Sequence, residues 1–223
     1  MILAYSKFGI SLEIAEDSVI SLTVEDPGCF AEMVRDIYIQ AKGGDGAFLL
    51  SERDKALKID KNIEVVINPF GIDFNDRKIQ NRLYDKLKVV STEFDNLLSD
   101  VDSAAVRLLY AITEQIPYNN ISFDLHTDIG GFLKLYHVQI DSSSYSNLIE
   151  LLCEYIKVLS GLTGVTILCL VDLKKYFSLS DMEMICKQAN YNKISIVFIQ
   201  SSEAYRVKNE KKYILDKDLC FIS

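Results

Sequence analysis

Two short runs of almost entirely apolar residues near the C-terminus constrain the fold more than any other feature. They lie at 165–171 and 194–199, and each follows a segment with the apolar spacing of a helix, at 148–159 and 182–189. Both runs are too short to cross a membrane and too continuous for a strand with one face in water. Buried strands that alternate with helices are typical of a parallel sheet, so we predict an α/β fold with these runs near its centre.

The rest of the chain adds shorter strands around an inserted helical segment. A first helix is predicted after Glu25-Asp26-Pro27, with Phe30 as a buried anchor and Gly43-Gly44 as its stop. Two apolar stripes between residues 77 and 116 predict a helical hairpin. Strand patterns lie at 2–5, 10–14, 19–24, 47–50, 56–59, 63–67 and 121–125, with edge strands at 213–215 and 219–222.

This order predicts a head that is interrupted by a helical leg. Residues 1–75 form the first part of the head, residues 76–117 the leg, with or without part of the helix at 142–160, and residues 118–223 the second part of the head. With 223 residues and 49% hydrophobic content, the chain can bury a substantial core. The five cysteines are odd in number and several lie in apolar runs, which indicates reduced thiols, and we expect a cytoplasmic protein.

Basic residues gather in the predicted hairpin of short strands and in the first predicted leg helix. The first group is Arg53, Lys55, Lys58 and Lys61. The net charge of −8 argues against a nucleic-acid partner unless the cations share one surface. Acidic residues are interspersed with both groups, so the pattern fits either phosphate contacts or an ordinary solvated surface of mixed charge.

The sequence contains no recognisable catalytic motif. The glycine clusters at 43–46 and 161–164 lack the Lys and Ser/Thr of a phosphate-binding loop and are interpreted as turns. Two histidines without a Cys-x-x-Cys pair do not specify a zinc site. Asp124, Asp128 and Asp141 bracket one stretch, and these carboxylates fit either a hard cation such as Ca²⁺ or a solvated acidic surface.

Three segments of the chain form a recognisable set. They lie at the first strand-to-helix junction, before the predicted leg and at the C-terminus. Their residues are Glu25-Asp26 with Phe30-Ala31, Gly71-x-Asp73-x-Asn75 with Leu83-Tyr84, and Val197-Phe198-Ile199 with Leu215-Asp216-Lys217-Asp218-Leu219. In these segments, and in the order of elements along nearly the whole chain, the sequence resembles the type II-A CRISPR-associated adaptation protein, the Csn-two family, in its short form.

The resemblance implies a homotetrameric ring whose α/β head has a mixed or parallel sheet and is related to P-loop ATPases without Walker motifs. It implies that the protein is not an enzyme, binds double-stranded DNA ends without sequence preference, and supports spacer acquisition in CRISPR antiviral defence. It also implies dependence on Ca²⁺, and as partners other copies of the chain, the CRISPR integrase pair and the RNA-guided effector nuclease. Two alternatives stay open: a protein-interaction scaffold, and a degenerate P-loop nucleotide hydrolase.

The sequence also departs from the pattern of that family. Ser122, His126, Thr127 and Gly131 stand where carboxylates are expected, which leaves Asp124, Asp128 and Asp141 as the predicted calcium ligands. Gln139 stands where a Lys is common. Lys134 therefore joins the first basic group among the predicted DNA-binding residues.

Overall fold

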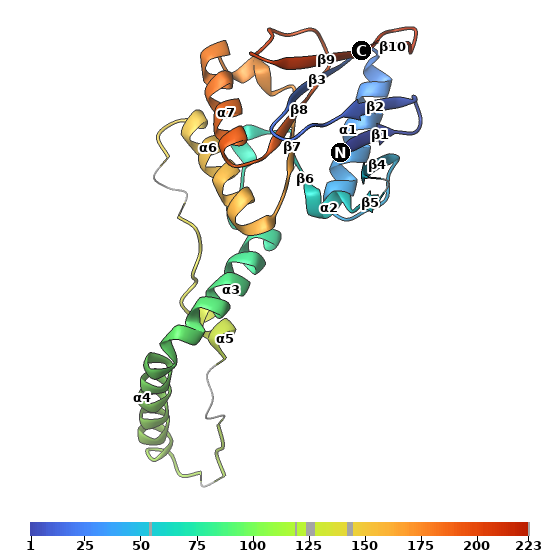
Figure 1. Cartoon of the computed structure of the whole chain (residues 1–223). Helices are drawn as coiled ribbons and strands as arrows, with labels where there is room; N and C mark the ends of the chain where they lie inside the picture. The colour runs from blue at the N-terminus through green and yellow to red at the C-terminus, as the bar shows by residue number, and fades with distance from the viewer. Residues whose placement is uncertain (54, 119, 124–127, 142–144, 223) are drawn as a thin grey trace. The chain divides into compact units, whose positions relative to one another are not determined.

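The structure is a computed structural model that describes residues 1–53, 55–118, 120–123, 128–141 and 145–222 (Figure 1). The chain forms two compact units. Unit 1 comprises Met1–Phe74 and Ser142–Ser223, and unit 2 comprises Asn75–Asp141. Unit 2 contains the range 76–117, in which the sequence predicts the leg, and continues to Asp141.

A six-stranded sheet in the order β10-β9-β3-β8-β7-β6 forms the centre of unit 1. Its strands are β3 (Val19–Val24), β6 (Ile63–Val66), β7 (Ile167–Val171), β8 (Ser195–Gln200), β9 (Glu210–Leu215) and β10 (Phe221–Ile222). The strands from β9 to β6 run parallel, while β10 is antiparallel to β9. Every residue of β7 and β8 is buried, so the predicted α/β class with these two runs inside the sheet is confirmed.

Several predicted strands differ from the observed ones. β9 is not an edge strand, because it lies between β3 and β10 and pairs with β3 along its whole length. The strand predicted at 56–59 ends at Leu57, and Ile59 is instead the buried first residue of the short helix α2 (Ile59–Asn62). Residues 121–123 form no strand, and residues 124 and 125 lie outside the described ranges.

Unit 1 also contains a second sheet, which is antiparallel and has the strand order β2-β1-β4-β5. Its strands are β1 (Ile2–Tyr5), β2 (Ile10–Glu13), β4 (Phe48–Glu52) and β5 (Lys55–Leu57). Together with α1 (Pro27–Ala41), its inward side chains pack on one face of the six-stranded sheet. Met33 and Ile37 are the fully buried residues of α1, whereas Phe30 is only partly buried. The predicted anchor is therefore wrong by one turn of the helix.

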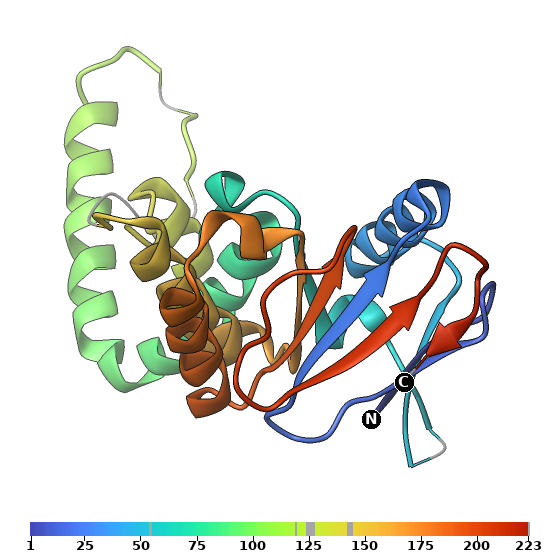
Figure 2. The ribbon, with the colours of Figure 1, turned by 90° about the horizontal axis from the view of Figure 1, so that it is seen from above.

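Two helices cover the opposite face of the six-stranded sheet (Figure 2). They are α6 (Leu148–Val158) and α7 (Leu179–Tyr191). The sequence predicts a turn at 161–164, but the chain first continues from α6 through a π-helical segment, Leu159–Thr163. It ends at Gly164, whose φ of 71° favours glycine. Ser178 and Asp181 form a capping box at the start of α7.

Unit 2 contains α3 (Arg77–Ser91), α4 (Asp95–Thr113) and α5 (Ile129–Leu135). α3 packs against α5, where the hydroxyl of Tyr84 donates to the carbonyl of Leu133 at 3.4 Å. The sequence predicts a hairpin of two long helices, but α3 makes its main helix contacts with α5 rather than with α4. Ser91 and Thr92 keep right-handed helical backbone between α3 and α4, so these two residues do not form the reversing loop that a hairpin needs.

Two general expectations from the sequence can be compared with this structure. Burial raises the pKa of the Cys169 and Cys186 thiols to about 12, as expected for core residues, while Cys220 is exposed. None of the helices in the described ranges combines the length and the apolar composition needed to cross a bilayer.

A buried carboxylate ties the first strands to α1. Asp36 accepts hydrogen bonds from the hydroxyl of Tyr5, the ammonium of Lys7 and the guanidinium of Arg35, each at 3.0 Å. Burial alone would raise the pKa of Asp36, but these donors outweigh it and lower the pKa to about 2. The network therefore depends on an ionised carboxylate.

We expect this network to make stability depend on pH in acid. The pKa of Asp36 in the folded chain lies below the ordinary value of about 3.9. Its contribution is therefore complete above pH 4 and is lost as the pH falls toward 2. The Asp36→Asn variant should be less stable at pH 7, and its melting temperature should fall less steeply between pH 4 and pH 2 than that of the wild type. Thermal melts with equal slopes would contradict this assignment.

Candidate nucleic-acid interface

The four basic residues predicted on the first hairpin follow one another along the chain, from the turn after β4 to the end of α2. We call Arg53, Lys55, Lys58 and Lys61 the hairpin group. Arg53 lies in the turn after β4, Lys55 begins β5, Lys58 caps α2 and Lys61 lies in the last turn of α2. All four side chains are exposed. The hairpin group is thus a set of cations that is local in the sequence, spread over one turn, the strand β5 and one short helix.

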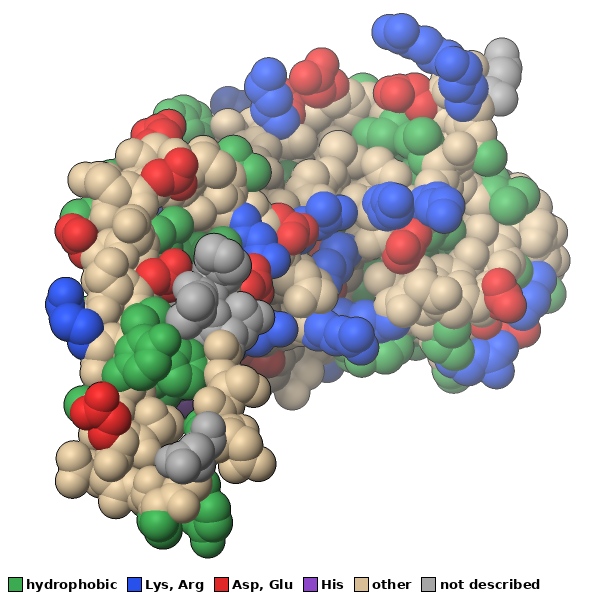
Figure 3. Space-filling model, turned by 90° about the horizontal axis from the view of Figure 1, so that it is seen from below, with side chains coloured by type: hydrophobic (Ala, Val, Ile, Leu, Met, Phe, Trp, Pro, Cys, Tyr) green, Lys and Arg blue, Asp and Glu red, His purple; other side chains and the backbone are tan. Residues whose placement is uncertain are grey.

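The local backbone explains why these side chains face solvent. Arg53 has a φ of 46°, a left-handed conformation that turns the chain between β4 and β5. α2 then buries Ile59 and leaves Lys58 and Lys61 outside. Within the described ranges, no ion pair engages the hairpin group. Its charges are therefore available to an external anion, although acidic and basic side chains are interspersed on the face shown in Figure 3.

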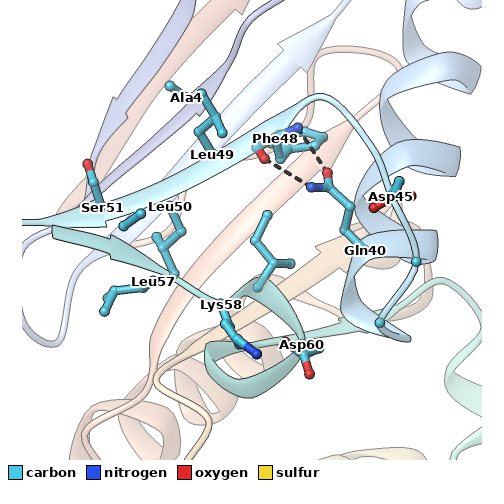
Figure 4. Close-up of a pocket in the computed structure, with 14 residues that line it drawn as sticks. Ala4, Gln40, Asp45, Phe48, Leu49, Leu50, Ser51, Leu57, Lys58 and Asp60 are labelled. Atoms are coloured by element: carbon cyan, nitrogen blue, oxygen red, sulfur yellow. Dashed lines mark hydrogen bonds between the residues drawn. The ribbon is translucent and has the colours of Figure 1, made fainter.

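A groove of about 760 Å³ reaches one member of the hairpin group, Lys58 (Figure 4). Its lining includes Leu49, Leu57 and, at one end, Lys58 with Asp60. The amide of Gln40 closes the groove by donating to and accepting from the backbone of Phe48, both at 2.9 Å.

The glycine cluster that borders this groove is a turn, as the sequence predicts. Gly43 has a φ of 89°. A Cβ atom on Gly44 would lie 2.5 Å from Cγ2 of Ile39. Glycine is therefore required here by backbone geometry and close packing.

The junction between β3 and α1 is unsuited to a phosphate. In nucleotide-binding α/β proteins, a helix that follows a strand offers its free N–H groups to a phosphate at such a junction. Here Oδ1 of Asp26 accepts the N–H of Cys29 at 2.8 Å, and this bond lowers the pKa of the Asp26 carboxyl. A phosphate at this position would meet an ionised carboxylate instead of free donors.

Lys134 and Asp128, two further predicted site residues, lie in unit 2. Lys134 is exposed in the last turn of α5, in a different unit from the hairpin group. Asp128 caps the N-terminus of α5 by accepting the N–H of Gly131 at 2.9 Å. The amides of Gly131 and Gly130, together with the charges of Lys88 and Lys134, lower the pKa of Asp128. Its carboxylate is thus held ionised.

Of the other two predicted calcium ligands, the structure describes Asp141 but not Asp124. Asp141 is exposed and follows Ile140, whose backbone exchanges two hydrogen bonds of 2.9 Å with the side chain of Asn75. Asp124 lies outside the described residues. Among those that are described, no three His, Cys, Asp or Glu side chains gather as a metal site would require. The three-aspartate site therefore stays a prediction.

α4 presents an apolar face that unit 2 leaves open. None of its side chains, all of them described, is buried, and Leu97, Leu108 and Ile112 are more than half exposed. A groove of about 640 Å³ lies between α4 and α5. Its apolar lining is Val101, Ala104, Ala105, Leu108, Phe132 and Leu135. This is the stripe that the sequence assigned to the second leg helix, and it forms an exposed patch of the kind that binds proteins.

Unit 1 also carries an exposed aromatic pair that no sequence motif indicates. Phe70 and Tyr176 meet with their ring centroids 5.4 Å apart, in two turns that are far apart in the sequence. An aromatic residue in a turn is too common a feature of sequences to have indicated this pair.

Comparisons with known proteins identify relatives of the chain. The family model described as CRISPR-associated protein (Cas_Csn2) matches residues 40–219. A search of curated proteins gives no match. Among solved structures, the crystal structure of Stu0660 of Streptococcus thermophilus is similar, with a TM-score of 0.63 and 10% sequence identity, over 89% of this chain and 68% of that chain. At this identity the structural likeness establishes the fold alone.

Proposed function

The chain belongs to the Cas_Csn2 family of CRISPR-associated proteins, which act in CRISPR adaptation, and from this premise we propose that it binds the ends of double-stranded DNA. In this proposal the protein works as a homotetrameric ring that holds duplex for spacer acquisition and catalyses no reaction. The observation that carries it is the hairpin group, four exposed cations without intramolecular ion partners in the described chain. The carboxylate of Asp26 at the β3–α1 junction supports a role without nucleotide chemistry.

Contacts to phosphates account for binding without sequence preference. Phosphate oxygens position a protein on duplex but carry no base information. Four copies of the hairpin group in a ring would multiply weak contacts, and the net charge of −8 matters less than the charge that lines the pore. Affinity for two duplexes of unrelated sequence should therefore be equal and should fall steeply with salt. A salt-independent affinity would contradict this proposal.

The apolar face of α4 supplies a surface for self-association in this proposal. Assembly would cover side chains such as Leu97, Leu108 and Ile112, which are now in water. Each fully covered side chain of this size contributes roughly 1.5 to 3 kcal/mol. The same face would also suit a protein-interaction scaffold. The two hypotheses differ in the partner, which is a second copy of this chain in the ring and a different protein in the scaffold.

In this proposal Asp124, Asp128 and Asp141 bind Ca²⁺. Asp128 fits a hard cation, because its carboxylate is kept ionised and has lone pairs beyond those that the amides of Gly131 and Gly130 engage. A bound ion would supply positive charge that offsets part of the acidic field near the phosphates.

We expect the Leu108→Asp variant to lose assembly. A charge placed on the apolar face of α4 would have to be buried in the interface, which is costly. Size-exclusion chromatography with light scattering should give the mass of four chains for the wild type in Ca²⁺ and a smaller mass for Leu108→Asp. Met184→Asp is the matched control, since Met184 is an equally exposed apolar residue on α7.

The same measurement in EDTA tests the metal. A smaller mass for the wild type in EDTA is expected. A tetramer in both Ca²⁺ and EDTA would remove calcium from the proposal and keep the ring. A wild type that is monomeric in Ca²⁺ would contradict the ring itself.

A further inference from the structure

An exposed pair of aromatic rings stands at the carboxyl ends of two neighbouring parallel strands. Phe70 follows β6 and is 71% exposed, while Tyr176 follows β7 and is 43% exposed. The rings meet edge to face, at an interplanar angle of 85°. The ammonium of Lys175 lies 5.1 Å from the centroid of the Tyr176 ring. Loops at this edge of an α/β sheet are where such folds commonly bind ligands.

The turn that carries Phe70 is fixed by its neighbours. It is the 3-10 helix η1 (Pro69–Gly71), in which Pro69 is buried. The side chain of Asn68 caps this turn by accepting the N–H of Phe70 at 3.1 Å. A largely exposed phenyl ring is therefore presented by a constrained backbone rather than by a free loop.

The turn that carries Tyr176 is fixed more strongly. It is the 3-10 helix η4 (Leu173–Tyr176), and its Lys174 is buried in an ion pair with Glu210 at 2.6 Å, with side-chain exposures of 2% and 3%. The ammonium of Lys174 also donates to the carbonyl of Tyr205 at 2.9 Å. In return, the hydroxyl of Tyr205 donates to the carbonyl of Phe177 at 2.9 Å.

The start of the same turn is held in place as well. Asp172 has a φ of 51°, and its carboxylate accepts the N–H and the hydroxyl of Ser201 at 2.8 and 2.7 Å. The side chains of Lys175 and Tyr176 are exposed, whereas those on either side of them, Lys174 and Phe177, are buried. The fold thus uses a buried charge pair to hold a turn whose exposed members are one cation and one aromatic ring.

We propose that Phe70, Tyr176 and Lys175 form a platform for a nucleobase at a DNA end, in which the more exposed ring of Phe70 stacks on the base and the ring of Tyr176 holds it edge to face, a proposal that rests on the DNA-binding function proposed above. The terminal base pair of a duplex exposes a π face, and stacking on an aromatic ring is tolerant of sequence because every base has such a face. Lys175 supplies a cation for the adjacent phosphate. The exposed neighbours are the apolar Ile67 and the polar Asn68 and Lys175, and the cation favours a nucleic acid over an apolar protein surface.

The test uses the intact protein and a blunt duplex with 2-aminopurine, a fluorescent base analogue, at its terminal position. Phe70→Leu and Tyr176→Leu keep apolar bulk but remove the flat ring, whereas Phe70→Trp keeps one. Tyr191→Leu is the matched control, because Tyr191 is an 86% exposed tyrosine on α7, away from the pair in sequence. Thermal melts establish that each variant is folded.

Each Leu variant at the platform is expected to bind the blunt duplex about 5- to 100-fold more weakly than the wild type. It should also lose the change in 2-aminopurine fluorescence on binding. Phe70→Trp and Tyr191→Leu should behave like the wild type. Unchanged affinity and fluorescence in the Leu variants would overturn the platform while leaving DNA binding intact. A wild type that binds no duplex would overturn the proposed function, and the platform with it.

Discussion

Replacing Lys174 with alanine should lower the free energy of unfolding by about 3 to 5 kcal/mol, the range expected when one partner of a buried ion pair is removed. The variant leaves the carboxylate of Glu210 almost fully buried, with the N–H of Val207 at 2.7 Å as its remaining close donor. It also removes the contact of the ammonium with the ring of Phe198, whose centroid is 4.4 Å away. An uncompensated charge inside unit 1 is the reason for the size of the effect.

Lys175→Ala is the matched control for this prediction. Lys175 precedes Tyr176 on the same turn but is exposed, so its loss should change stability by less than about 0.5 kcal/mol. The double variant Lys174→Met with Glu210→Leu removes both charges and should recover much of the loss. Urea unfolding followed by circular dichroism measures all three. A Lys174→Ala variant as stable as Lys175→Ala would show that the buried pair does not hold the turn.

Reversing the charge of Lys55, Lys58 and Lys61 together should weaken duplex binding by roughly 100-fold or more at fixed salt. Each lost phosphate contact also removes about one unit from the slope of log affinity against log salt. Because these side chains are exposed, the variant should fold normally. Fluorescence anisotropy with labelled duplex over a salt series gives both quantities.

A second triple variant separates position from total charge. Lys187, Lys193 and Lys208 are also exposed lysines of unit 1, and their replacement by glutamate changes the net charge equally. This control should keep most of the affinity and the salt slope. If both triple variants lose affinity to the same extent, the hairpin group is not the DNA-binding surface.

The centre of the fold could be predicted because its signal is local. Strands β7 and β8 are nearly unbroken apolar runs, so the sequence alone indicates burial on both faces. The sequence predicts an edge strand at 213–215, whereas β9 begins three residues earlier, in the charged stretch Glu210, Lys211 and Lys212. Glu210 is buried because Lys174, 36 positions away, reaches it across the fold. Long-range pairing of this kind leaves no periodic trace in the sequence.

The candidate site was only partly predictable for the same reason. The hairpin group is local in the sequence, and its charged residue types were enough to indicate exposure, although Lys58 and Lys61 lie at α2 rather than on the predicted hairpin. Asp128 had a readable local signal that was missed, since an Asp before an apolar helical segment is a typical N-cap. The pairing of Phe70 with Tyr176 joins two distant turns and could be seen only in the folded chain.

The most direct test of the proposed function compares linear and covalently closed circular duplex of the same sequence. Both forms present the same phosphates, so only a requirement for free ends distinguishes them. We predict that the wild type binds linear duplex and binds the closed circle far more weakly. Both affinities should fall as the salt concentration is raised. Equal affinity for the two forms would contradict the binding of DNA ends by a ring.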